Sequence, residues 1–262
     1  MTVRRRVQLA VLGISLVVAG VAVVAQVQFP FRGGRGRGEP IPDSLHVPYD
    51  GRFAFVRLRY ASNFGGFGFR REPPWSHDYP RGERNFMKIL KEITYLTPHL
   101  TESNILTLDD PELFNFPVAY MCEPGFWTLT EPEAAAFRAY LLKGGFAIFD
   151  DFRGSDWDNF EEQIRTVLPD ARFVELDATH PIFHSFFEIN SLEFVQYYDR
   201  GTPIFYGVFE DNDPKKRLML IANYNNDISE YWEFSDTGFV PIDLSNEAYK
   251  FGVNYIVYGM TH

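Results

Sequence analysis

Hydrophobic and polar positions alternate along the chain in two repeating patterns. Residues 53–60 are rich in strand-forming side chains and predict a first β-strand. Over residues 85–97, apolar side chains recur at helical spacing, which predicts a helix with one face in the core. Further strands are predicted at 118–121, 146–149, 173–176 and 218–222, and further helices at 157–168 and 245–258.

One more helix, between Thr130 and Gly144, carries its own start and stop signals. Thr130-Glu-Pro-Glu133 has the spacing of a capping box, with proline in the first turn. Gly144-Gly145 then ends the helix, because glycine readily adopts the left-handed conformation found just past a helix end. Strands and helices that alternate over short links predict a three-layer α/β domain, a mostly parallel sheet with helices on both faces.

The first 27 residues fit neither pattern. Three arginines at positions 4–6 precede a run, residues 7–27, with only three clearly polar side chains. A helix of that length spans about 30 Å, the thickness of the hydrocarbon core of a bilayer, and the arginines favour export of the chain beyond the run. Val23-Val24-Ala25 is a passable cleavage site, whereas the length of the run favours a retained anchor. A signal peptide and a transmembrane anchor both stay open, and either predicts an envelope protein, periplasmic or exported, anchored in the inner membrane if the leader is kept.

Residues 28–50 join this leader to the predicted folded domain, residues 51–262. They are rich in glycine, proline and arginine, which is typical of a flexible tether. The net charge is −10, and loss of the three leader arginines would leave −13. A domain of that charge repels nucleic acid, so we expect no nucleic-acid partner. Because of the leader, we expect the membrane and an envelope protein as partners.

Several motifs, taken in order, resemble a known prokaryotic family. They are Phe116-Pro-Val-Ala-Tyr-Met121, Leu129-Thr-Glu-Pro-Glu133, Leu141-Leu-Lys-Gly-Gly-Phe146, Asp150-Asp151, His180-Pro-Ile-Phe183 and Phe251-Gly-Val-Asn-Tyr-Ile-Val-Tyr258. Their order and spacing, over roughly residues 50–260, resemble the domain of unknown function 4159. The resemblance implies a flavodoxin-like sheet similar to that of class I glutamine amidotransferases, and it implies no established reaction. Relatives often carry a Thr-Gly-His-like stretch where this chain has Cys122-Glu123-Pro124.

Polar residues come directly after several of the predicted strands. In open α/β sheets, ligands bind beyond the carboxyl ends of the strands, which gathers residues 63–66, 122–123, 150–151 and 223–227 at one rim. Asn63 is a candidate ligand-binding residue there. It opens a long, glycine- and proline-rich aromatic stretch, residues 63–82, which is predicted as a functional loop beside the end of the first strand.

Cys122 and Glu123 are each candidate catalytic residues that would act together with an imidazole. An amidotransferase-like nucleophile needs a tight turn flanked by glycine, and no glycine lies beside Cys122. A neighbouring carboxylate also raises the pKa of a thiol. A small, half-buried thiol is therefore favoured over a nucleophile. As the only cysteine, Cys122 also excludes an internal disulfide.

The pair Asp150-Asp151 is the best functional lead. Adjacent carboxylates at a strand end can bind a cation or cap the next helix, and capping is the favoured interpretation. Asp150 is a candidate for ligand binding and Asp151 for catalysis.

His180 is the candidate imidazole, since Pro181 holds the backbone extended and could present the ring to the rim. A structural histidine, hydrogen-bonded to backbone, is the more common arrangement. His184 lies four residues on, but Pro181 argues against a shared helix face, so no metal site is predicted.

Residues 223–232 are polar and aromatic and come after a strand. Asn223 and Asp227 could bind a sugar or peptide by hydrogen bonds, with Trp232 stacked on it, although the same residues suit a plain turn. Glycine-rich nucleotide-binding and serine-hydrolase patterns are missing, so no cofactor is expected.

These residues support two main functions. The leading one is a non-catalytic binding or scaffolding domain of the cell envelope. Its rival is a hydrolase that uses a strand-end carboxylate or thiol together with His180. Carbohydrate recognition by residues 223–232 is a third possibility.

Overall fold

The computed structural model describes residues 45–62, 72–101, 103–193 and 201–262. The predicted leader, most of the predicted tether and the candidate Asn63 lie outside these residues. Among the helices within them, none is both long and apolar enough to cross a bilayer.

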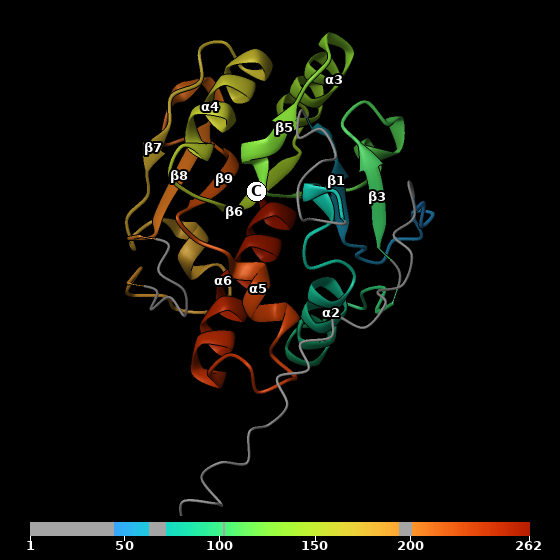
Figure 1. Cartoon of the computed structure of the whole chain (residues 1–262), viewed down its shortest axis with the longest axis vertical. Helices are drawn as coiled ribbons and strands as arrows, with labels where there is room; N and C mark the ends of the chain where they lie inside the picture. Colours follow the sequence, from blue (N-terminus) through green and yellow to red (C-terminus); the bar gives the residue numbers. More distant parts are fainter. Residues whose placement is uncertain (1–44, 63–71, 102, 194–200) are drawn as a thin grey trace, which may run out of the picture. The chain divides into compact units, whose positions relative to one another are not determined.

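Seven strands form one sheet in the order β3-β1-β4-β6-β9-β8-β7 (Figure 1). The first five run parallel, whereas β8 is antiparallel to β9 and β7 is antiparallel to β8. In chain order, the five parallel strands are arranged 2-1-3-4-5, one of the two common orders of doubly wound sheets. The seven strands are β1 Val56–Arg59, β3 Asn104–Thr107, β4 Val118–Cys122, β6 Phe146–Phe152, β7 Val174–Glu175, β8 Ile204–Phe209 and β9 Leu218–Tyr224, and a separate antiparallel pair comprises β2 Ala61–Ser62 and β5 Trp127–Thr128.

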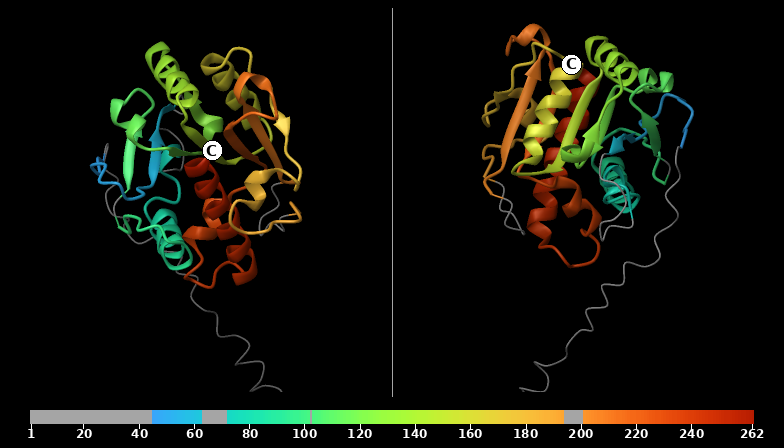
Figure 2. Two further views of the ribbon diagram at one scale, coloured as in Figure 1. Left: turned by 180° about the vertical axis from the view of Figure 1, so that it is seen from behind. Right: turned by 45° about the horizontal axis from the view of Figure 1, so that its top comes forward.

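Helices cover both faces of the sheet, as predicted. The α-helices are α2 Arg81–Ile93, α3 Glu131–Leu142, α4 Asp156–Val167, α5 Ile228–Glu233 and α6 Ile242–Thr261, and the 3₁₀ helices are η1 Pro74–Ser76, η2 Pro111–Asn115, η3 Pro124–Phe126, η4 Pro181–His184 and η5 Glu210–Asn212. One hydrophobic cluster packs α3 and α4 against the sheet, and a second packs α2, α5 and α6 against the other face. In both views of Figure 2, the red α6 lies on the same side of the sheet as the teal α2.

Strand β4 shows how the sequence divides the core between the two faces. Its residues are all buried, and successive side chains of a strand point to opposite faces. Ala119 and Met121 therefore belong to the cluster with α3 and α4, whereas Tyr120 and Cys122 belong to the cluster with α2, α5 and α6. Cys122 consequently ends the strand on the α2 side.

The start and stop signals of α3 are confirmed. The Thr130 hydroxyl accepts from the backbone N–H of Glu133, and the Glu133 carboxylate accepts from the backbone N–H of Thr130, which is the complete capping box. The helix ends at Leu142, and Gly144 lies just beyond it with a φ of 113°.

Several elements differ from the prediction. Strands β3 and β8 lie in stretches for which no strand was predicted, and the predicted turn within 223–232 contains the short helix α5. Strand β3 is an edge strand, and the chain just before the domain covers it: Leu45 and Ile105 exchange two backbone hydrogen bonds of 3.3 and 2.9 Å. The packed part of the chain thus reaches back to Leu45.

Candidate functional site

The sheet has a topological switch point between β1 and β4. The connection that leaves β1 leads to β3 on one side, while the connection that leaves β4 leads to β6 on the other. The carboxyl ends of these strands are where ligands bind in such sheets. Cys122 and Glu123 stand at the end of β4, and Asp150 and Asp151 stand near the end of β6.

A further pair of residues, His77 and Asp78, reaches the same place from the segment between η1 and α2. Arg57 of β1 holds this segment, because its guanidinium donates to the carbonyl oxygens of Trp75 and His77 at 3.0 and 2.8 Å. The same guanidinium is hydrogen-bonded to the carboxylate of Glu83 on α2, and both side chains are buried. A buried ion pair therefore fixes the backbone that carries His77.

Three carboxylates surround one nitrogen of the His77 imidazole. Nδ1 lies 2.8 Å from Oδ2 of Asp151, 3.6 Å from Oδ1 of Asp78 and 3.7 Å from Oε1 of Glu123. The side chains of these three acids are 6%, 0% and 4% exposed, whereas the side chain of His77 is 22% exposed. We call His77, Asp78, Glu123 and Asp151 the His77 cluster.

The carboxylates set the charge of the imidazole. The Asp78 carboxylate, together with the hydrogen bond from Nδ1 to Asp151, raises the pKa of His77 far above its ordinary value, although burial opposes this. Without a bound cation, the imidazole is thus protonated at neutral pH and offsets part of the negative charge around it. An imidazolium cannot accept a proton, so in this state His77 is not a general base.

The thiol of Cys122 lies beneath the cluster. Its Sγ is 4.0 Å from Oδ2 of Asp78 and 3.9 Å from Oδ2 of Asp151, and the residue is fully buried. Burial raises the pKa of Cys122 well above its usual range. The sequence indicates a half-buried thiol, and the finding is that no part of it is exposed.

All three acids of the His77 cluster have an unusual backbone conformation. Asp78 has a φ of 65°, Glu123 a φ of 48° and Asp151 a φ of 57°, all in the left-handed region. Since side chains alternate along a regular strand, Asp150 and Asp151 would face opposite ways. The left-handed residue Asp151, at a register shift between β6 and β9, interrupts this alternation and lets both carboxylates reach the α2 and α5 side.

Asp150 acts as a remote cap for α5. Its Oδ2 accepts from the backbone N–H groups of Ile228 and Ser229 at 2.9 and 3.0 Å, and its Oδ1 accepts from the Asn223 amide at 3.0 Å. Burial nevertheless raises the pKa of Asp150 to about 6. Capping was the favoured interpretation of the pair, but the helix involved is α5 rather than the next helix, α4.

A chain of hydroxyl groups connects Asp150 to the His77 cluster. The Tyr120 hydroxyl lies 3.1 Å from Oδ2 of Asp150 and 2.7 Å from Oγ of Ser229. The Ser229 hydroxyl in turn donates to Oδ2 of Asp78 at 2.6 Å. Asp150 is therefore linked to the His77 cluster through the hydroxyl groups of Tyr120 and Ser229. Its own oxygens accept hydrogen bonds from α5 and from Asn223.

Two further acids on α5, Glu230 and Glu233, lie close to Asp78. One oxygen from each of the three carboxylates lies within 4.8 Å of the others. Burial, and after it the charge of Asp78, raises the pKa of Glu233 to about 8. The acids at this rim are crowded enough that one of them holds a proton near neutral pH.

His180 does not join this group. Its Nδ1 accepts from the backbone N–H of Ile182 at 3.2 Å, and its ring packs against Phe209 and Tyr258. Both rings lie by Leu218 at the amino end of β9, the opposite end from Asn223: Phe209 pairs with Leu218, whose backbone N–H donates to the Tyr258 hydroxyl. This arrangement is that of a structural histidine, the more common of the two arrangements considered from the sequence.

The remaining candidates belong to the packing of the strand end. The side-chain Oδ1 of Asn223 accepts from the Tyr255 hydroxyl at 3.0 Å. Asp227 is the N-cap of α5, where its Oδ1 accepts from the backbone N–H of Glu230. Trp232 is 3% exposed and stacks on Phe86 with ring centroids 4.4 Å apart. Its ring is therefore not available to stack on a glycan.

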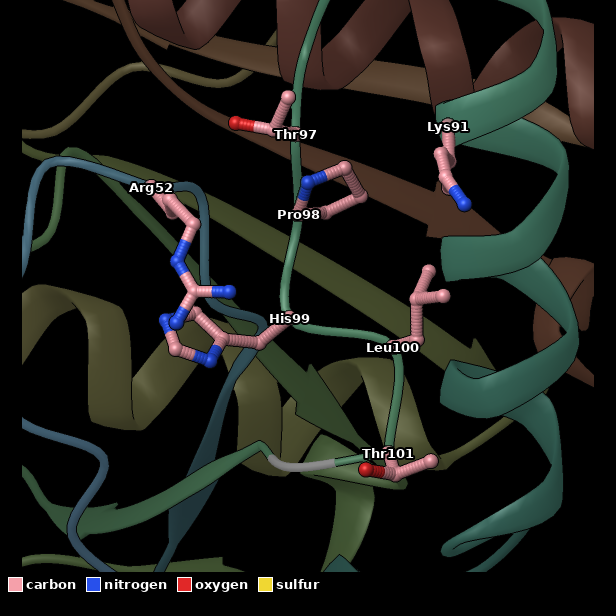
Figure 3. Close-up of a pocket in the computed structure, with 7 residues that line it drawn as sticks. All are labelled: Arg52, Lys91, Thr97, Pro98, His99, Leu100 and Thr101. Carbon is pink, nitrogen blue, oxygen red and sulfur yellow. The ribbon is translucent and has the colours of Figure 1, made fainter.

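A separate hollow of about 410 Å³ lies at the amino ends of β1 and β3 (Figure 3). Lys91 of α2 stands across it from the segment Thr97–Thr101, and Arg52 lies beside His99. Asp50 already pairs with both of these, at 2.6 Å from Arg52 and 3.2 Å from His99. The hollow is remote from the His77 cluster, which is at the opposite rim of the sheet.

The fold and this rim define a doubly wound α/β protein with a buried acidic cluster at its switch point. Residues 54–260 match the model of the family described as Domain of unknown function (DUF4159), and the chain belongs to that family. The resemblance stated from the sequence motifs is thereby confirmed at the level of the family. A search of curated proteins found no match.

The sequence analysis missed His77 and Asp78 as individual residues. Both lie within the stretch 63–82, which was predicted as a functional loop. A signal was present there, because His77 and Asp78 come directly after Pro73-Pro74-Trp75-Ser76, a proline-rich stretch typical of a turn. What the sequence could not show is that Arg57 holds this turn against the ends of β4 and β6.

Proposed function

We propose that this protein is a non-catalytic binding or scaffolding domain of the cell envelope, built on a flavodoxin-like fold of the class I glutamine amidotransferase type. The strand order 2-1-3-4-5 supports the flavodoxin-like part of this proposal. The apolar run at residues 7–27 and the arginines before it support the location.

One observation carries the non-catalytic part: the only thiol, Cys122, is closed off. It is fully buried among carboxylates that disfavour the thiolate, and the thiolate is the form that attacks a substrate. At the end of β6, Asp150 is engaged by α5 and Asp151 by His77. No nucleophile of the amidotransferase kind is therefore presented at this rim within the described residues.

The binding role is tested by affinity capture from membranes solubilised in mild detergent. The full-length chain serves as bait, and the matched control carries residues 1–50 fused to an unrelated soluble domain, so that leader and tether are the same. We expect a partner at near-stoichiometric yield with the full chain and not with the control. Failure to recover such a partner under several mild conditions would count decisively against a scaffold.

The pair of His77 and Asp151 favours a second candidate, a hydrolase whose imidazole is His77. A carboxylate hydrogen-bonded to Nδ1 orients an imidazole as in a general-base pair. The charge argues against it, because the surrounding acids keep His77 protonated at neutral pH. Hydrolysis of ester or amide substrates that is lost in both His77→Ala and Asp151→Asn, and kept in His180→Ala, would establish this candidate over the scaffold.

The location is tested independently of the activity. N-terminal sequencing of the protein recovered from the envelope fraction separates the two open outcomes, because a cleaved leader gives a new N-terminus after the apolar run. Recovery of the intact chain in the cytoplasmic fraction alone would refute the envelope assignment.

A further inference from the structure

The His77 cluster has more buried negative charge than its single imidazole can neutralise. Three carboxylates with side chains at most 6% exposed converge on one ring nitrogen, and a further acid, Glu230, lies close to Asp78. The nearby Arg57 is already paired with Glu83. Buried charges in proteins are normally paired or bound to a metal ion.

We propose that the His77 cluster is a closed binding site for one divalent transition-metal ion, with Zn²⁺ as the ion to test first. The imidazole Nδ1 and one oxygen from each of the three carboxylates supply four ligand atoms. The ion takes the position of the proton that Nδ1 otherwise shares with Asp151. This inference concerns the ion alone and holds whether or not the domain has a protein partner.

The distances from the imidazole nitrogen to the carboxylates are close to those around a tetrahedral ion. With metal–ligand bonds of about 2.0–2.2 Å, adjacent ligand atoms of a tetrahedral site lie about 3.3–3.6 Å apart. Nδ1 is 2.8, 3.6 and 3.7 Å from the three carboxylate oxygens. His77, Glu123 and Asp151 offer ligand atoms that lie within 4.8 Å of one another, and Asp78 lies within that distance of His77 and Cys122. To complete the site, the Asp78 oxygen would have to move toward the other two carboxylates.

Asp78 gives a second, independent indication. Its side chain is fully buried, and its Oδ1 accepts no hydrogen bond. The other oxygen, Oδ2, is used by Ser229 and is held in place by it. Oδ1, the oxygen that accepts no hydrogen bond, is the one that lies 3.6 Å from Nδ1 of His77. A buried carboxylate oxygen without a donor is costly, and a cation at this point removes the cost.

The ligand atoms of the cluster indicate which class of metal ion it would bind. One imidazole nitrogen with three carboxylate oxygens suits Zn²⁺ and similar first-row ions, whereas Ca²⁺ and Mg²⁺ prefer ligand sets made of oxygen alone. Four protein ligands also leave no open position for water or substrate, which is typical of structural sites. The ion would tie the segment before α2 to the ends of β4 and β6.

The test uses the full-length chain, purified in mild detergent with a tag that contains no histidine and stripped with a chelator. Zinc content after equilibrium dialysis is measured by elemental analysis, and thermal unfolding is recorded with and without Zn²⁺. We expect one ion per chain, an apparent dissociation constant of about 1 µM or tighter, and a rise in midpoint of roughly 5–10 °C at saturation. A Co²⁺ titration should give the visible absorption of a tetrahedral site.

Variants locate the ion. His77→Ala and the near-isosteric Glu123→Gln should each weaken binding at least about 100-fold and abolish the rise in midpoint. His184→Ala is the matched control, because His184 forms an exposed pair with Glu188 that could bind zinc adventitiously. That variant should bind Zn²⁺ as the wild type does.

Circular dichroism of the metal-free variants separates loss of the site from loss of the fold. The proposal is overturned if the stripped wild type binds no first-row divalent ion below about 100 µM, a concentration at which a closed four-ligand site is filled. It is equally overturned if Zn²⁺ binding survives in folded Glu123→Gln or disappears in His184→Ala. The two proposals can fail separately. Recovery of a partner would support the scaffold even if no Zn²⁺ binds, and Zn²⁺ binding would support the metal site even if no partner is recovered.

Discussion

Replacing Arg57 with methionine should destabilise the protein strongly, because this one guanidinium does three things inside the core. It neutralises Glu83, and it donates to the carbonyl oxygens of Trp75 and His77. Its side chain is 1% exposed and that of Glu83 is 3% exposed, so water cannot replace the lost partner. Burial already raises the pKa of Glu83 even with the guanidinium beside it.

The magnitude can be worked out from these contacts. Removing one partner of a buried ion pair costs about 3–5 kcal/mol, and each carbonyl left without its donor adds about 1 kcal/mol. A total of about 5–7 kcal/mol corresponds to a fall in the thermal midpoint of roughly 10–28 °C for a domain of this size. The double variant Arg57→Met, Glu83→Met removes both charges, so we expect it to recover about 3 kcal/mol relative to the sum of the single changes.

Urea unfolding of the full-length chain, monitored by circular dichroism and tryptophan fluorescence, measures each corner of this cycle. Glu83→Met alone completes it and should also be strongly destabilised, since it leaves the guanidinium unpaired. The reasoning is refuted if Arg57→Met costs less than about 1 kcal/mol, or if the two changes are additive within about 0.5 kcal/mol. Either result would mean that the pair is hydrated or that the segment before α2 is held by other contacts.

Other parts of the fold lead to three smaller predictions. Thr130→Ala removes the capping box of α3 and should cost about 1 kcal/mol in urea unfolding, while Thr130→Ser keeps it; equal loss in both would disprove the role of the hydroxyl. Native Cys122 should react with iodoacetamide at least about 100-fold more slowly than in urea, and complete native labelling within minutes would contradict its burial. Burial lowers the pKa of His180 in the folded state, so the unfolded chain binds its proton more readily and stability is lost as the pH falls below about 6.5. His180→Asn should reduce this acid-side loss in urea unfolding between about pH 7 and pH 5, and an unchanged pH dependence would show that the ring is not what titrates.

The strands and helices with clear periodicity could be predicted from the sequence because their local signals agree with the tertiary packing. The capping box at Thr130 and the apolar face of α2 are of this kind. Strand β3 could not be recognised in the same way, since only two of its four residues are apolar and their burial comes from β1 and the segment at Leu45. Local sequence carries little information about such long-range pairing.

The location of the candidate site at the strand ends could be predicted from the sequence, but the set of side chains that meet there could not. The rule that ligands bind at strand ends correctly gathered Cys122, Glu123 and Asp151. It also drew in His180, which the structure puts near the amino end of β9 against Phe209 and Tyr258. The imidazole that does lie beside these carboxylates is that of His77, and buried Arg57 of β1 holds its backbone in place. No pattern in a single sequence shows which turn a buried arginine will bind.

The pairing of Leu45 with Ile105 has a consequence for how this protein must be handled. An uncovered parallel edge presents a row of free N–H and C=O groups to which a neighbouring molecule can add its own strand. Here the chain supplies that cover itself, just before the domain begins. A shortened form that starts at residue 51 would expose β3, and we expect it to self-associate at concentrations where a form starting before Leu45 remains monomeric.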